Sequence, residues 1–420
     1  MNYSKLASKL RTKLANFSGY VSKGLDKSAK RFIREACYGI LSSQSVLLTQ
    51  MGRSLETKIS LKKIEERFCR QLHKNQLWEQ IHSNVLQQAC RRIKDDTLLV
   101  LDLSDIHKKY AREMEYLAMV RDGSDGGAIV KGYWSTQVIG AELNSNEFIP
   151  LYQDLYSQNS PDFISENAEI LKAIEMINSH LNGRGIWVID RGGDRRVLYD
   201  HLLYRRSKKR FIIRLVGSRH LICGRSTLLA SELANNCPCP YQDTIVKEKN
   251  GEEKALHISY GYKKVKLPNH DDELFMLVVK GTGKNPMMLL TTEPLRRNKE
   301  VLRRILCSYI KRWSIEETIR FIKQTYDLEN IRVLKYTRMK NIMALLLVVF
   351  YFIAVVIDTS QTLKIMTGHL LRQAKRVFGI PNFKYYALGD GISAIFKKSP
   401  GKIQQITKKY KQNQLSFGFT

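Results

Sequence analysis

Apolar residues recur at helical spacing through the first part of the chain. Residues 1–30 carry four apolar side chains three or four positions apart: Leu6, Leu10, Leu14 and Phe17. This spacing predicts an amphipathic helix. A second helical run covers residues 42–55, and after a break near residues 56–59 a third begins behind Ser60 as N-cap and ends at Leu72. Two short helices joined by a turn are typical of a helix-turn-helix motif and also of helical bundles in general. Residues 1–95 are therefore expected to form a helical N-terminal region.

At Thr97 the pattern changes to that of buried strands. Residues 98–106 form a continuous apolar run ending in acidic residues, and a second such run ends at Asp190. Each run predicts a strand that delivers a carboxylate at its end. Between and after them, further strands are expected at 128–143, 147–152 and 210–215, with helices at 165–181 and 197–206. This alternation predicts an α/β core whose first part spans residues 96–216.

The α/β rhythm stops at residue 217. Short strand patterns separated by Gly, Asn and Pro are expected at 244–248, 254–260, 263–266, 273–280 and 287–292. They predict a mostly antiparallel insertion over residues 217–293. Residues 294–367 then return to helices and complete the core.

Two features of the last third of the chain bear on location. Residues 342–357 form an uncharged apolar run of sixteen residues, which is shorter than the ~20 residues of a membrane-spanning helix and therefore predicts a buried core helix and no membrane association. Residues 368–420 are basic and poor in strand patterns. They predict a helical or partly disordered C-terminal region that contacts DNA or another copy of the chain.

Charge indicates the partner. The chain has 69 Lys and Arg residues against 40 Asp and Glu residues, which gives a formal net charge of +29 and a pI of about 9.8. A balance this basic implies a polyanionic partner, and nucleic acid is the leading candidate. The basic N-terminal helices are accordingly expected to bind DNA. Seven cysteines at irregular spacings are typical of a reducing compartment, and not of a disulfide framework.

One polar stripe stands out among the helices expected after residue 294. Four residues with functional side chains lie within about 60° of one another on a single helix: Tyr309, Arg312, Glu316 and Lys323. A carboxylate flanked by an arginine and a lysine suits a metal ion held next to a phosphate. The same stripe is also typical of a solvated helix with salt bridges. The adjacent Glu317 is rotated by about 100° from the stripe and is expected to face solvent or pair with a neighbour such as Arg320.

Three carboxylates can be combined into one site. Asp102 and Asp190 follow apolar strands and Glu316 lies on a helix, although each alone is equally typical of a cap, a turn or a surface position. If they converge at one sheet edge, they could hold two divalent ions ~3.5–4 Å apart for in-line phosphoryl displacement. Ligands that are all oxygen favour Mg²⁺, with Mn²⁺ as a substitute.

These residues resemble those of bacterial insertion-sequence transposases of the DDE class. The resemblance covers roughly residues 95–360, and it is to the family with a Tyr-x2-Arg-x3-Glu-x6-Lys motif, matched here by Tyr309, Arg312, Glu316 and Lys323. Further matching segments are Asp102-Leu-Ser-Asp-Ile, Lys131-Gly-Tyr-Trp134, Asp190-Arg-Gly-Gly-Asp194 and Leu289-Leu-Thr-Thr-Glu-Pro294. One position departs from the family, because Met287 stands where its best-studied members have a base-stacking tryptophan.

The resemblance implies a fold, a site and an activity. The fold is a ribonuclease H-like domain interrupted by the β-strand insertion, between a helical N-terminal region and a helical C-terminal region. Asp102, Asp190 and Glu316 would be catalytic metal ligands, while Tyr309, Arg312, Lys323 and Arg191 would contact DNA.

The implied activity is DNA transposition. A transposase binds double-stranded DNA at the terminal inverted repeats of its element, cleaves it with Mg²⁺ and joins the 3′ ends to target DNA. It would act as a homodimer on paired ends in the bacterial cytoplasm, at the nucleoid. Two alternatives stay open: a nuclease of the same fold that does not join strands, and a catalytically silent or domesticated DNA-binding repressor.

Overall fold

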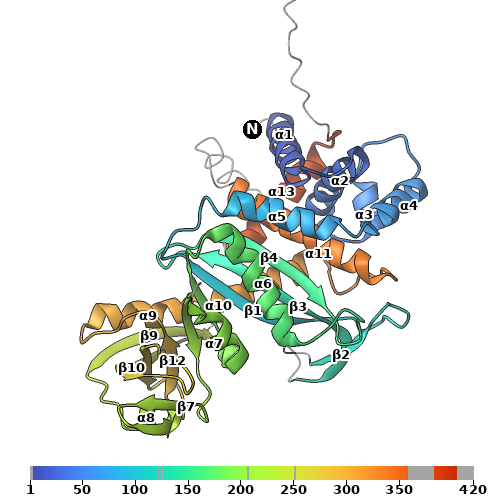
Figure 1. Ribbon diagram of the computed structural model, residues 1–420. Helices are drawn as coiled ribbons and strands as arrows, with labels where there is room; N and C mark the ends of the chain where they lie inside the picture. Colours follow the sequence, from blue (N-terminus) through green and yellow to red (C-terminus); the bar gives the residue numbers. More distant parts are fainter. Residues whose placement is uncertain are drawn as a thin grey trace, which may run out of the picture.

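The computed structural model describes residues 3–121, 123, 127–205, 208–249, 252–357 and 383–403. Within them, a ten-stranded mixed sheet is combined with helices, as the α/β prediction requires. Figure 1 shows the N-terminal helices at one end of the molecule and the insertion strands at the other, with β1 and α10 between them.

The first half of the sheet is built around β1 (Leu98–His107). This strand pairs antiparallel with β3 (Ile129–Ala141) and parallel with β5 (Ile186–Ile189), which in turn pairs parallel with β6 (Arg210–Arg214). The other edge of β3 carries β2 (Ala118–Arg121) and β4 (Phe148–Tyr156). Every side chain of β5 is buried, because a central parallel strand is covered on both faces.

The insertion continues this sheet. Its strand β12 (Met287–Thr291) pairs antiparallel with β6, and the antiparallel strands β11 (Leu274–Lys280), β10 (Glu252–Val265) and β9 (Tyr241–Lys249) follow outward. Beside them lie a hairpin of β7 (His220–Cys223) and β8 (Ser226–Leu229) and the short helix α8 (Ala230–Asn235). The antiparallel pairing agrees with the sequence pattern.

Gly261 corrects one detail of the insertion. We expected separate strands at 254–260 and 263–266 with a turn between them, but β10 runs through Gly261 without a break. A Cβ atom at this position would lie 2.0 Å from the carbonyl oxygen of Pro238. The glycine is therefore needed for the close approach of another backbone segment, and not for a turn.

The N-terminal helices share a core with the end of the chain. They are α1 (Tyr3–Val21), α2 (Lys27–Ser43), α3 (Leu48–Arg53), α4 (Leu61–Leu72) and α5 (Leu77–Ala89). They pack with α11 (Tyr336–Tyr351), with the π-helical turn Phe352–Val356 and with α13 (Tyr385–Lys398), as Figure 1 shows. The apolar stripe of α1 is buried in this packing, where Phe17 stacks on Tyr351 with ring centroids 5.5 Å apart.

Two helix limits in this region test the sequence prediction. The helix expected at 42–55 is wrong, because α2 ends at Ser43 and Gln44 adopts a left-handed conformation with φ of 55° before α3 begins. Ser60 does stand at the N-cap of α4, which ends at Leu72 as expected. Its side chain makes no capping hydrogen bond.

The apolar run after residue 341 forms a core helix. Across the described residues, the segment Tyr336–Val356 is the one helix long and apolar enough to cross a membrane, and 89% of its apolar window is buried inside the protein. This burial agrees with the predicted core helix. Most of the C-terminal region, residues 368–382 and 404–420, lies outside the described residues. The helical structure predicted for this region can therefore be compared only with residues 383–403, which include α13.

The stripe helix is interrupted. We expected one continuous helix over residues 309–323, whereas α9 (Lys299–Lys311) ends before Arg312 and α10 (Trp313–Thr325) begins after it. The N–H of Arg312 donates to the carbonyl of Tyr309, three residues back, at 3.1 Å. The prediction of a single regular helix is therefore wrong at Arg312.

Candidate active site

The two strand carboxylates are brought together by the parallel pairing of β1 and β5. Leu101 pairs with Ile189, so the next residues along both strands, Asp102 and Asp190, stand side by side. Asp190 ends β5 as expected, and its side chain accepts a hydrogen bond from the N–H of Gly192 at 2.7 Å. Asp102, in contrast, lies in the middle of β1, because pairing with β3 extends this strand to His107. Its predicted position at a strand end is wrong.

Arg312 joins the helix carboxylate to the strand carboxylate. Helix α10 packs against β1. One guanidinium nitrogen of Arg312 lies 3.3 Å from Asp102 Oδ2, and another lies 3.0 Å from Glu316 Oε1. The side chain of Arg312 is only 9% exposed, that of Asp102 is 16% exposed and that of Glu316 is 53% exposed. The arginine thus occupies the space between two of the three predicted ligands.

The pKa of Asp102 responds to the charges around it. Burial raises the pKa of Asp102 to about 7; Arg312 opposes this shift, while the charges of Asp190 and Glu316 add to it. Burial by itself would lower the pKa of Arg312, but the surrounding carboxylates, led by Asp102, raise it above the usual range. The guanidinium therefore neutralises a cluster of acids that would otherwise repel one another.

The other motif residues occupy different environments. Tyr309 is buried, with 1% of its surface exposed, and its ring lies 5.7 Å from the Arg312 guanidinium carbon. Lys323 lies 3.2 Å from Asp105 and 3.3 Å from Glu329, a partner that the sequence pattern did not indicate. Arg191 is exposed on the 3-10 turn Arg191–Gly193. In this arrangement Tyr309 supports Arg312 by packing, and Arg191 is open to solvent.

Glu317 has the orientation expected from helix geometry. Its carboxylate forms an ion pair with Arg320, three residues further along α10. Arg312 instead pairs with Glu316. The expected pairing of Glu317 with Arg320 is therefore confirmed, while the choice of Glu316 as the site residue stays a prediction.

Asp194, in the same sequence element as Asp190, has a structural role. Its buried side chain accepts hydrogen bonds from Arg219 at 2.7 Å, from the N–H of Val216 at 2.7 Å and from the hydroxyl of Tyr199 at 3.0 Å. These three donors occupy most of the about four acceptor sites of a carboxylate. Asp194 therefore fixes the start of the insertion against the core.

Sequence reasoning missed Lys108, which positions the end of α10. This lysine is 1% exposed, and its ammonium group donates to the carbonyls of Leu328, Glu329 and Ile331 at 2.6, 3.2 and 3.0 Å. It thereby ties the end of β1 to the segment after α10. A single lysine after a strand gives no sequence signal for such a role.

The chemistry of the acids suits magnesium, although the side chains are not arranged as a complete ligand set. Asp102, Asp190 and Glu316 offer only carboxylate oxygens, the ligands that Mg²⁺ and Mn²⁺ prefer. In the described parts of the chain, no three Asp, Glu, His or Cys side chains are grouped so that they could hold a metal ion. The Arg312 guanidinium lies where Asp102 and Glu316 would share a cation.

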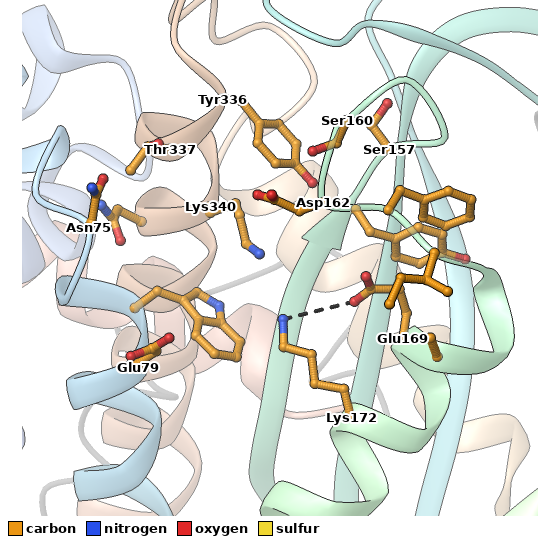
Figure 2. Close-up of a pocket in the computed structure, with 16 residues that line it drawn as sticks. Asn75, Glu79, Ser157, Ser160, Asp162, Glu169, Lys172, Tyr336, Thr337 and Lys340 are labelled. Carbon is orange, nitrogen blue, oxygen red and sulfur yellow. Dashed lines mark ion pairs between the residues drawn. The ribbon is translucent and has the colours of Figure 1, made fainter.

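A separate pocket lies away from these acids. This pocket of about 440 Å³ is lined by α5, α6 (Glu166–Leu181) and α11, and it includes none of the three predicted ligands. Figure 2 shows Lys172 directed at Glu169, which lies three residues earlier on the same helix, α6. The buried Asp154 lies 2.8 Å from Lys172 and 3.3 Å from Lys340. Both lysines of the pocket therefore have internal partners.

Comparison with known proteins gives distant structural neighbours among solved structures. No protein-family model matches the sequence, and no curated protein matches it. Among solved structures, a cryo-EM structure of a piggyBac transposase synaptic complex with hairpin DNA aligns with a TM-score of 0.44 and 11% identity, over 96% of this chain and 86% of that chain. At this TM-score and identity the likeness establishes neither the fold nor the function of this chain.

Proposed function

We propose that this chain is a DDE transposase of the bacterial insertion-sequence type. In this proposal it binds the inverted repeats of its element as a homodimer and cleaves and joins DNA in a reaction that depends on Mg²⁺. The observation that carries the proposal is the placement of Asp102 and Asp190 at one level of adjacent parallel strands, with Glu316 held beside them through Arg312.

The order of strands supports a ribonuclease H-like core. Three antiparallel strands, β4, β3 and β1, are followed by β5 and β6, which run parallel to β1. The insertion leaves this core after β6 and ends before α10, which carries Glu316. This is the position that the resemblance implies for an insertion.

Each residue can be given a role in phosphoryl transfer. Two divalent ions, when bound, would stabilise the attacking and leaving oxygens. Asp102, Asp190 and Glu316 would hold them. Arg312 and Lys323 now pair with Asp102, Glu316 and Asp105, and as bidentate and point-charge donors they would turn to phosphate oxygens when DNA is present. Arg191 would add a contact from the rim.

The decisive experiment compares the two adjacent glutamates. Purified protein is incubated with Mg²⁺ and with duplex DNA carrying the ends that flank its own gene. We expect Glu316→Gln to slow strand cleavage by at least about 100-fold in single-turnover assays, since it removes a ligand to the reacting centre. Glu317→Gln should keep most activity, because its partner Arg320 is exposed and lies outside the acid cluster. The reverse order would overturn the site assignment.

Binding and product analysis separate the alternatives. Asp102→Asn and Asp190→Asn should abolish cleavage while retaining affinity for the DNA ends, because most affinity comes from phosphate contacts elsewhere. Cleaved ends that are never joined would indicate a nuclease. Specific binding without cleavage by the unaltered protein would indicate a repressor.

A further inference from the structure

A basic pocket lies among the N-terminal helices. Its volume is about 400 Å³, and it is enclosed by α2, by the connection between α3 and α4, by α4 and by residues 401–403. Five cationic side chains line it: Arg31, Arg34, Lys58, Arg67 and Lys402. Two carboxylates, Glu35 and Glu56, oppose them. The pocket therefore carries an excess of positive charge.

Two donors in this pocket are buried without an acceptor. Arg34 Nε and Arg67 Nη1 are both shielded from solvent, and neither has a hydrogen-bond partner among the described residues. A buried guanidinium N–H that donates to nothing is costly, and native proteins rarely leave one unpaired. The side chains that carry these donors come from different helices, and both side chains line the pocket.

The two carboxylates of the pocket do not accept hydrogen bonds from these two donors. Glu35 is already shared between Arg31, at 2.7 Å, and the second terminal nitrogen of Arg67. Glu56 is exposed, and within the described parts of the chain it forms no ion pair with Arg34 or Arg67. Burial lowers the pKa of Arg34, which shows that its charge is incompletely compensated.

We infer that this pocket binds a phosphate-type oxyanion, with Arg34 Nε and Arg67 Nη1 as paired donors from two helices. An oxyanion accepts several hydrogen bonds at once, and arginine matches its geometry. The phosphate could belong to a DNA backbone or be free in solution. The anion site itself does not depend on the proposed transposase activity, whereas its use by DNA rests on that proposal.

The first test uses inorganic phosphate and the full chain. Isothermal titration should show saturable binding that Arg34→Gln weakens about 10- to 100-fold, the loss expected for a charge-assisted hydrogen bond. Arg34→Lys, which keeps the charge but not the Nε donor, should also weaken it. The matched control is Arg53→Gln, which removes an exposed arginine of α3 outside the pocket and should leave binding unchanged.

A gain-of-affinity variant guards against loss of folding. Glu56→Gln removes an exposed carboxylate from the pocket and should tighten phosphate binding about two- to fivefold. No saturable binding by the unaltered chain, or equal binding by the Arg34 and Arg53 variants, would overturn the inference.

The second test uses duplex DNA without Mg²⁺. If the pocket holds a backbone phosphate, Arg34→Gln should reduce the slope of log affinity against log salt by about 0.9. An unchanged slope with weakened phosphate binding would assign the pocket to free phosphate and refute its use by DNA. Neither result depends on cleavage, so failure of the active-site proposal would be seen separately, in the Glu316→Gln assay.

Discussion

Replacing Arg312 by methionine tests whether this side chain holds the position of a cation in the acid cluster. The guanidinium contacts Asp102 at 3.3 Å and Glu316 at 3.0 Å, and a divalent ion shared by those carboxylates would have to displace it. Methionine keeps a long apolar side chain but has no donor and no charge. We therefore expect Arg312→Met to bind Mn²⁺ more tightly than the unaltered protein.

The size of the effect follows from the two contacts. The Asp102 contact is mostly buried, and a charge-assisted hydrogen bond of this kind contributes about 1.5–3 kcal/mol. Glu316 is 53% exposed, so its pair contributes at most about 0.5 kcal/mol. Removing a competitor worth about 2 kcal/mol should raise the affinity for Mn²⁺ about 30-fold, because about 1.4 kcal/mol corresponds to a factor of ten.

The assay is a titration with Mn²⁺ in the absence of DNA, monitored by calorimetry or electron paramagnetic resonance. It is best performed at pH 8, above the pKa of about 7 to which burial raises Asp102 in the unaltered protein; in the variant, loss of the Arg312 charge raises that pKa further. Arg320→Met is the matched control, since Arg320 pairs with Glu317 outside the cluster. Equal or weaker Mn²⁺ binding by Arg312→Met would show that the guanidinium does not compete with the ion.

Three further predictions concern stability. Burial lowers the pKa of His82 to about 4, so the folded protein binds fewer protons than the unfolded chain between pH 4 and 6.5; the stability it contributes is complete above pH 6.5 and is lost as pH falls. Between pH 7.5 and pH 5, the free energy of unfolding measured with urea should fall by about 2 kcal/mol more in the unaltered protein than in His82→Gln. An equal decrease in both proteins would refute this. Lys108→Met should lower the free energy of unfolding by about 2–4 kcal/mol in the same assay, because three buried carbonyl groups lose their hydrogen-bond donor. A decrease below about 1 kcal/mol would show that water replaces the lysine. Asp194→Asn should cost about 2–3 kcal/mol by breaking the pair with Arg219, and unchanged stability would contradict its structural role.

The sequence by itself determined the local features of the site. Apolar runs marked β1 and β5 and placed an aspartate after the second of them, because a buried strand needs apolar side chains on both faces. The phase of one helical turn also separated Glu316 from Glu317 and paired Glu317 with Arg320. Such features depend on residues only a few positions apart.

Tertiary structure decided how those pieces meet. The register of β1 against β5 sets Asp102 beside Asp190, although the two residues are far apart in sequence. The packing of α10 on β1 brings Arg312 between two carboxylates that lie on different elements. Periodicity carries no information on contacts between distant segments, since the energy of burial and pairing arises only once those segments are in contact.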